Sequence, residues 1–213
     1  MLANLNLTLE QASEILELSI GDYVNVRTRY WTDVDVAVHS YLLGNQTTAE
    51  FKNFMNSAIR RAFQDAADIA WMDGKALLPL ETETQNYLLA RMQEDYSFTV
   101  SLGQRLRMIR QEGMVDYWGE ARARADGYTR TLDNIYSSIK LLALPNVMLT
   151  FAGMSGKPPE FPCKDCKRLI GKRHRAKWWV AHDKIPGSHT GFECGGWKCR
   201  HVLIDDGGQL YAL

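Results

Sequence analysis

Two features are missing from this chain of 213 residues: a long hydrophobic run and an overall excess of charge. No stretch reaches the roughly 18 consecutive apolar residues of a membrane-spanning helix, so the sequence predicts no membrane partner. The N-terminal segment MLANLNLTLEQASEILEL lacks the basic start and the apolar run of a secretory signal, and we expect none. The formal net charge is zero, so the chain as a whole does not predict attraction to nucleic acid or to anionic lipid.

Cysteine is absent from the first 162 residues, and all four cysteines follow. They form two close pairs, Cys163 with Cys166 and Cys194 with Cys199, which are separated by 27 residues. In a protein without signs of export, such pairs indicate a metal site rather than disulfides. Each short loop presents two thiolates, and two such loops supply the tetrahedral ligand set that zinc prefers. The sequence therefore predicts a structural zinc site with these four cysteines as ligands.

Two histidines leave the identity of one ligand open. His201 lies two residues after Cys199, and His189 lies five residues before Cys194, so either imidazole could replace one thiolate. Four protein ligands close the coordination shell, whereas a catalytic zinc keeps an open position, so we expect no enzymatic role for the metal. A module of about 45 residues has little apolar core and usually needs such a staple to fold.

The region before the cysteines has the pattern of successive long helices. TLEQ at Thr8 and TTAE at Thr47 have the form of a capping box, and each begins a helical pattern. The apolar spacing predicts a helix over 21–44 ending at Gly44, one stopped by Gly74, one from Thr82 to about Glu112, and one over 118–142 closed by Pro145. The third of these is expected to bury Leu88, Met92, Tyr96, Val100, Leu106 and Ile109.

The pattern changes after Pro145. NVMLTFAG has strand character, MSGKPPEFP is a proline-rich loop, and RHVLIDDGGQLYAL reads as a strand, a turn and a short final strand. We therefore predict a mainly α protein with two parts. A long-helix bundle covers residues 1–145, and a basic, cysteine-rich, zinc-stabilised module of α+β or β-hairpin type covers residues 146–213.

The neutral total hides a strongly basic segment. Between Lys157 and His201 the chain has eleven Lys and Arg residues and four Asp and Glu residues, which leaves +7. Lys172, Arg173, Arg175 and Lys177 are the candidate contacts with DNA or a protein partner, because cations beside aromatic rings can bind nucleic acid. Alternatively, Trp178, Trp179 and Trp197 pack around the metal as a small core, and the cations lie on a solvated face.

A nuclease is the enzymatic alternative. AHDKIPG, between the two cysteine pairs, loosely resembles part of the zinc-containing HNH nucleases. Here the order is His182-Asp183, and no Asn follows at the metal-binding position, so the general base and one metal ligand of that family are missing. A zinc-dependent nucleic-acid-binding regulator is a further alternative, and its affinity would fall steeply with salt.

The order of these features resembles the phage head morphogenesis family, the minor capsid proteins of the Mu F type. GNQTTAEF, a helix ending in AWMDG, CKDCKRLIGKRH and CGGWKCRHVL occur in that order over most of the chain. The specific positions are Cys163, Cys166, Leu169, Gly171, Pro186, His189, Cys194, Cys199, Arg200 and His201. The usual closing Cys-Arg-Cys of that family is Cys199-Arg200-His201 here.

The resemblance implies a non-enzymatic structural and assembly protein. Its expected place is the virion head, after synthesis in the host cytoplasm, with several copies in each virion. Its expected partners are the portal protein, the major capsid protein or both, together with packaged DNA near the basic surface.

Overall fold

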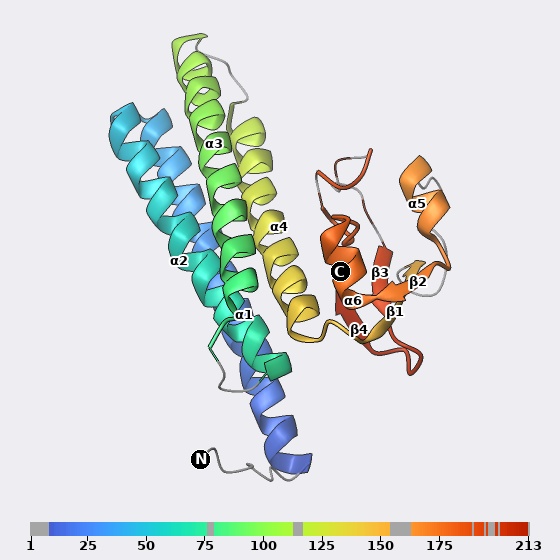
Figure 1. Ribbon diagram of the computed structural model, residues 1–213. Coiled ribbons are helices and arrows are strands. Elements are labelled where there is room, and N and C mark those ends of the chain that lie inside the picture. The colour runs from blue at the N-terminus through green and yellow to red at the C-terminus, as the bar shows by residue number, and fades with distance from the viewer. Residues whose placement is uncertain are drawn as a thin grey trace.

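The fold of the chain is given by a computed structural model. It describes residues 9–75, 79–112, 117–153, 163–188, 190–193, 195, 199 and 201–212. Four long helices form an elongated bundle: α1 (Leu9–Leu42), α2 (Thr48–Lys75), α3 (Thr82–Glu112) and α4 (Tyr117–Ala143). A small sheet with two short helices lies beside the C-terminal end of α4 (Figure 1).

Local sequence signals position the helix ends. At the start of α2 the Thr47 hydroxyl accepts the backbone N–H of Glu50 at 3.2 Å, and the Glu50 carboxylate accepts the N–H of Thr47 at 2.8 Å. This reciprocal pair is the predicted capping box. The two N-terminal helical patterns join into the single helix α1, and Gly44, with φ of +80°, follows its end. The cap proposed at Thr8 lies outside the described residues.

Helix α2 contacts each of the other three helices, and its apolar stripe forms the centre of the bundle. α2 ends at Lys75, one residue after the predicted stop at Gly74, so the glycine lies within the last turn of the helix. A Cβ at Gly74 would lie 2.6 Å from the Cβ of Ala143, so the glycine permits a close approach of α2 and α4.

Most of the predicted inward face of α3 is buried, but Val100 is 44% exposed. At about 100° per residue, Val100 lies roughly 120° around the helix from Leu88 and Leu106, which are both buried. The prediction for Val100 is therefore wrong, because steps of four residues drift away from the core stripe.

In its described residues, the C-terminal module combines four strands with two short helices. They are β1 (Met148–Gly153), α5 (Lys164–Leu169), β2 (Arg173–Arg175), α6 (Ala176–Ala181), β3 (His201–Ile204) and β4 (Leu210–Ala212). The sheet is antiparallel in the order β2-β1-β3-β4. The strand predicted before the cysteines, β1, and the two strands predicted after them, β3 and β4, are confirmed. The predicted turn between β3 and β4 is confirmed too, and there the Asp205 carboxylate accepts the N–H groups of Gly207 and Gln209. The predicted loop MSGKPPEFP lies outside the described residues.

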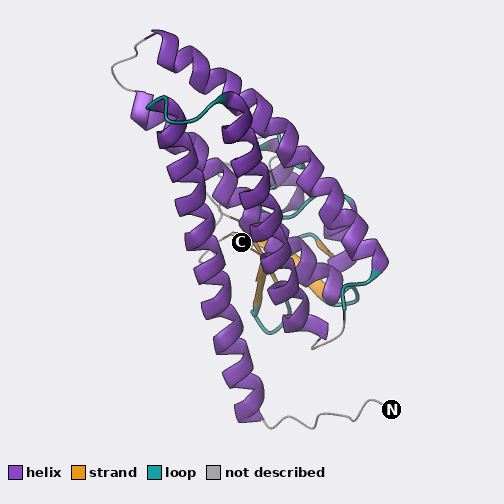
Figure 2. Ribbon diagram, turned by 90° about the vertical axis from the view of Figure 1, so that its left-hand side faces the viewer, coloured by secondary structure: helices purple, strands orange, loops and turns teal. Residues whose placement is uncertain are grey.

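The two parts have separate apolar cores that meet at α4. In the module, Leu149, Phe151, Trp179 and Leu203 are fully buried, and Leu141 of α4 belongs to the same cluster. Seen from the side, the sheet lies behind the helices of the bundle (Figure 2). The predicted boundary at residue 145 falls in the turn between α4 and β1. Among the described helices, none is both long enough and apolar enough to cross a bilayer.

Candidate metal centre

The first cysteine pair lies at the N-terminus of α5. Cys163 is the N-cap of this helix, and its Sγ accepts the backbone N–H of Cys166 at 3.4 Å. This cap turns both thiols in the same direction, with their Sγ atoms 3.2 Å apart. Cys166 is buried, and Cys163 is half-buried. The tight turn after α5 uses Gly171, whose φ of +76° favours glycine, and it leads the chain into β2.

The second part of the cluster lies at the start of β3. The Sγ of Cys199 lies 3.5 Å from Nδ1 of His201, and the register of β3 with β1 pairs His201 with Gly153. The His201 ring stacks on Phe151 at 4.8 Å between ring centroids, and the residue is 2% exposed. Burial lowers the pKa of His201, which favours the neutral imidazole that binds metals.

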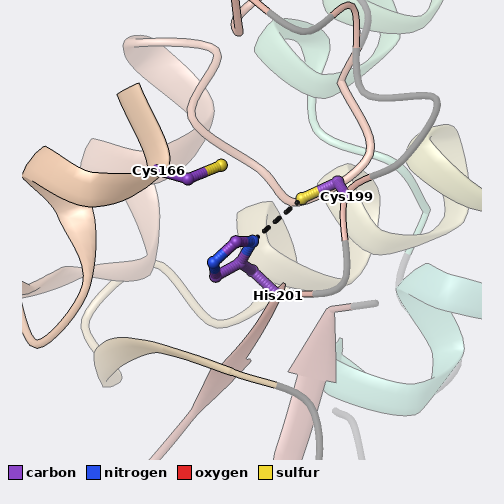
Figure 3. Close-up of side chains that lie close together, drawn as sticks. All are labelled: Cys166, Cys199 and His201. Atoms are coloured by element: carbon purple, nitrogen blue, oxygen red, sulfur yellow. Dashed lines mark hydrogen bonds between the residues drawn. The ribbon is translucent and has the colours of Figure 1, made fainter. Parts of the chain in front are cut away.

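Cys166, Cys199 and His201 point toward one another (Figure 3). Cys166 lies in α5, Cys199 in the loop before β3, and His201 at the start of β3. Their ligand atoms lie within 4.8 Å of one another, so this group could hold a metal ion. In a tetrahedral zinc site, ligand lengths of about 2.3 Å for sulfur and 2.0 Å for nitrogen give edges of about 3.5 Å between sulfur and nitrogen and about 3.8 Å between two sulfurs. The separation between Sγ of Cys199 and Nδ1 of His201 fits the sulfur–nitrogen edge. The other ring nitrogen of His201, Nε2, is buried without a hydrogen-bond partner. The side chains therefore fit a metal.

The structure thus brings together Cys166, Cys199 and the predicted alternative ligand His201. Cys163 lies beside Cys166 but is not part of this mutually close group. Cys194 and His189 lie outside the described residues. The neighbouring Glu193 is held against α5, because its backbone N–H donates to the Asp165 carboxylate at 2.8 Å. The Glu193 carboxylate also lies 3.6 Å from the Lys164 ammonium group.

The nuclease-like fragment is part of a closed loop. The Asp183 carboxylate accepts hydrogen bonds from the hydroxyls of Ser188, at 2.7 Å, and Thr190. Asp183 itself has a φ of 50°, and a Cβ at Gly191 would lie 1.5 Å from the Asp183 carbonyl oxygen. The loop can close only with glycine at position 191. The sequence analysis missed the hydroxyl partners of Asp183. The only signal for this loop in the sequence is the glycine at position 191.

The four candidate contact residues are all exposed. Arg173 and Arg175 belong to β2, Lys172 precedes this strand, and Lys177 lies in α6. Arg173 forms an ion pair with Asp206. Strand β2 is at the edge of the sheet, where charged residues also discourage pairing with another strand.

The tryptophans divide between core and surface. Trp179 is fully buried beside Phe151, and its indole N–H donates to the His174 carbonyl at 3.2 Å. Trp178 is only half-buried. The expectation of a tryptophan core is therefore met by Trp179, whereas Trp197 lies outside the described residues.

Comparison with known proteins found no matching family model, no matching curated protein and no matching solved structure. The resemblance to phage head morphogenesis proteins thus stays a prediction.

Proposed function

We propose that this protein is a non-enzymatic structural and assembly protein of a bacteriophage head, with a C-terminal module held by one zinc ion. The observation that carries this proposal is the convergence of Cys166, Cys199 and His201, with Cys163 beside Cys166 as a further thiol. These are positions on which the family resemblance rests. The C-x-x-C pair and the closing Cys-Arg-His segment are far apart in the sequence. They must come together in this way if both are to bind one ion.

Zinc is the metal that this ligand set favours. Thiolate and imidazole ligands are typical of structural zinc, whereas calcium and magnesium prefer oxygen ligands. Three thiolates and one imidazole fill a tetrahedral shell, so no position remains for a substrate or an activated water. The metal would then join α5 to β3 and close the module.

The environment of His182 and Asp183 supports a structural role for this fragment. The Asp183 carboxylate is engaged by two hydroxyls of its own loop. The His182 Nδ1–H donates to the Trp178 carbonyl at 2.9 Å. A metal ligand or general base at Asp183 would need a carboxylate that is free of these hydroxyls, whereas the hydrogen bond of His182 only orients its ring. We therefore favour an assembly role over the HNH-like nuclease.

The bundle would supply the docking surface for the portal or the major capsid protein. Leu43, Leu89 and Val100 are exposed to 63%, 56% and 44%, respectively. Leu89 and Val100 lie on α3 and Leu43 in the turn after α1, where the face of a partner can cover such side chains. The protein would be made in the host cytoplasm and kept in the virion head, with the basic surface of its module near packaged DNA.

Mass spectrometry of purified phage particles tests this proposal. We expect the chain in DNA-filled heads, in few copies relative to the major capsid protein. An internal control is a phage protein that is expressed in the same cells but is not assembled into particles. Absence of the chain from particles assembled while it is present in the cell would contradict the proposal, as would cleavage of plasmid DNA by the purified protein with Mg²⁺.

A further inference from the structure

Three aromatic rings form a column that runs from His174 in β2, over Trp178 in α6, to His182 at the end of this helix. The ring centroids of His174 and Trp178 lie 3.7 Å apart with an interplanar angle of 15°. Those of Trp178 and His182 lie 4.2 Å apart with an angle of 20°. The helical repeat of α6 brings His182 over Trp178, four residues earlier, whereas His174 reaches the other side of the column from strand β2. The separations are close to those between stacked planar rings.

The column has one well-exposed end. Both flat faces of Trp178 are covered, one by His174 and the other by His182. His182 is exposed, and Trp178 is its only ring contact among the described residues. The hydrogen bond from its Nδ1 to the Trp178 carbonyl fixes the orientation of the ring. The outer face of His182 is therefore a preoriented flat surface that faces solvent.

Three cations lie close to this column in the sequence: Arg175 in β2, Lys177 in α6 and Lys172 just before β2. Lys172, Arg175 and Lys177 are exposed, and none of them forms an ion pair with another described residue. By contrast, Arg173 is paired with Asp206, and the Lys184 ammonium donates to the Gly191 carbonyl. The first turn of α6 contains no acidic residue. These three positive charges are thus not neutralised by an ion pair with a described residue.

We infer that this surface binds single-stranded nucleic acid. One unpaired base stacks on the outer face of His182 and continues the column, while Lys177, Arg175 and Lys172 neutralise the adjoining phosphates. Bases have flat faces whatever their sequence, so stacking of this kind is tolerant of sequence. A duplex offers its phosphates but keeps its bases inside the helix, so it gains only the electrostatic part. This inference deepens the proposed contact with DNA and rests on the same basic module.

Fluorescence anisotropy with the full-length, metal-loaded protein tests it. The probes are a labelled oligo-dT strand, an oligo-U strand of the same length and a DNA duplex. We expect tighter binding to single strands than to the duplex. The tighter of the two strands identifies whether DNA or RNA is the better ligand.

Two substitutions separate stacking from charge. His182→Ala should weaken single-strand binding about tenfold, since one base–ring stack has that value, and should leave duplex binding nearly unchanged. His182→Phe should restore the affinity, because it keeps a flat ring. Lys177→Ala should weaken binding to every probe and reduce the salt slope for single strands by about 0.7.

Lys52→Ala is the matched control, because Lys52 is an exposed lysine of α2 far along the chain from the column. It should change none of these affinities. Circular dichroism would check that each variant is folded, and His182 and Lys177 are both exposed. The inference is overturned if His182→Ala binds single strands as tightly as the original protein does. It is also overturned if the original protein binds the duplex as tightly as single strands and His182→Ala weakens both affinities equally. Neither result would affect the test on phage particles.

Discussion

The helical bundle and the C-terminal module reach stability by different physical means. In the bundle, α2 buries Phe51, Met55, Ile59 and Phe63 completely against its three neighbours, and such burial is worth about 1.5–3 kcal/mol for each large side chain. The module has a smaller described core around Phe151 and borrows Leu141 from α4. Apolar packing thus stabilises the bundle, whereas the module, with its smaller described core, would depend on the proposed metal.

Removal of one metal ligand should break this comparison most strongly. Cys166→Ser should abolish zinc binding and expose the backbone amides of β1 and β3 to hydrogen exchange, while the amides of α2 stay protected. Structural zinc contributes about 10–16 kcal/mol of apparent free energy in small zinc-binding domains at pH 7, more than this module can replace. Metal analysis and hydrogen exchange measured by mass spectrometry would detect both effects.

Cys194→Ser and His201→Ala are the matched variants for the ligand set. If His201 is the fourth ligand, Cys194→Ser keeps one zinc per chain and His201→Ala loses it. The opposite result would restore the four-cysteine set that the sequence alone predicts. A protein with two disulfides and no zinc would contradict the metal site altogether.

The free energy of unfolding of the bundle should depend on pH through Asp95. This side chain is 2% exposed, and its Oδ2 has no hydrogen-bond partner. Burial raises its pKa to about 7; Arg91 acts in the opposite direction, and Glu94 raises it further. An unfolded Asp has a pKa of about 3.9, so on raising the pH the unfolded chain loses this proton first. The contribution of Asp95 to stability therefore decreases between about pH 4 and 7 and is constant above this range.

Urea unfolding followed by helical circular dichroism between pH 5 and 8 would test this dependence. Asp95→Asn should remove most of the decline and raise the stability at pH 8. Asp22→Asn, at an exposed site of α1, should follow the original protein. Parallel curves for the original protein and Asp95→Asn would show that Asp95 does not titrate in this range. Metal binding by the module should have the opposite trend, because its ligands are protonated in acid.

The same difference explains what could be predicted from the sequence. The bundle was predictable because capping and apolar spacing are local signals, and the box at Thr47 and the span of α3 are confirmed. In the module, α5 and α6 have six residues each, too short for a periodic pattern. The cysteine spacing indicated a metal, but the choice of His201 depends on β3 pairing with β1, a contact between distant segments. The column of His174, Trp178 and His182 also requires knowing that α6 begins directly after β2.

Substitutions of two glycines in the bundle have the smallest expected effects on stability. They test whether the bundle and the module are stabilised independently. Gly74→Ala places a methyl group 2.6 Å from Ala143 and should cost about 1–3 kcal/mol, because both backbones must separate. Gly103→Ala places its methyl 3.5 Å from Phe51, an ordinary contact, and should gain up to about 1 kcal/mol from helix propensity. Urea midpoints at pH 8 would give both values.

Zinc content should be unchanged in both variants, since packing of α2 and closure of the metal shell are separate sources of stability. A gain for Gly74→Ala would mean that α2 and α4 do not approach closely at this end, and zinc loss in Gly103→Ala would mean that the two parts are not stabilised independently.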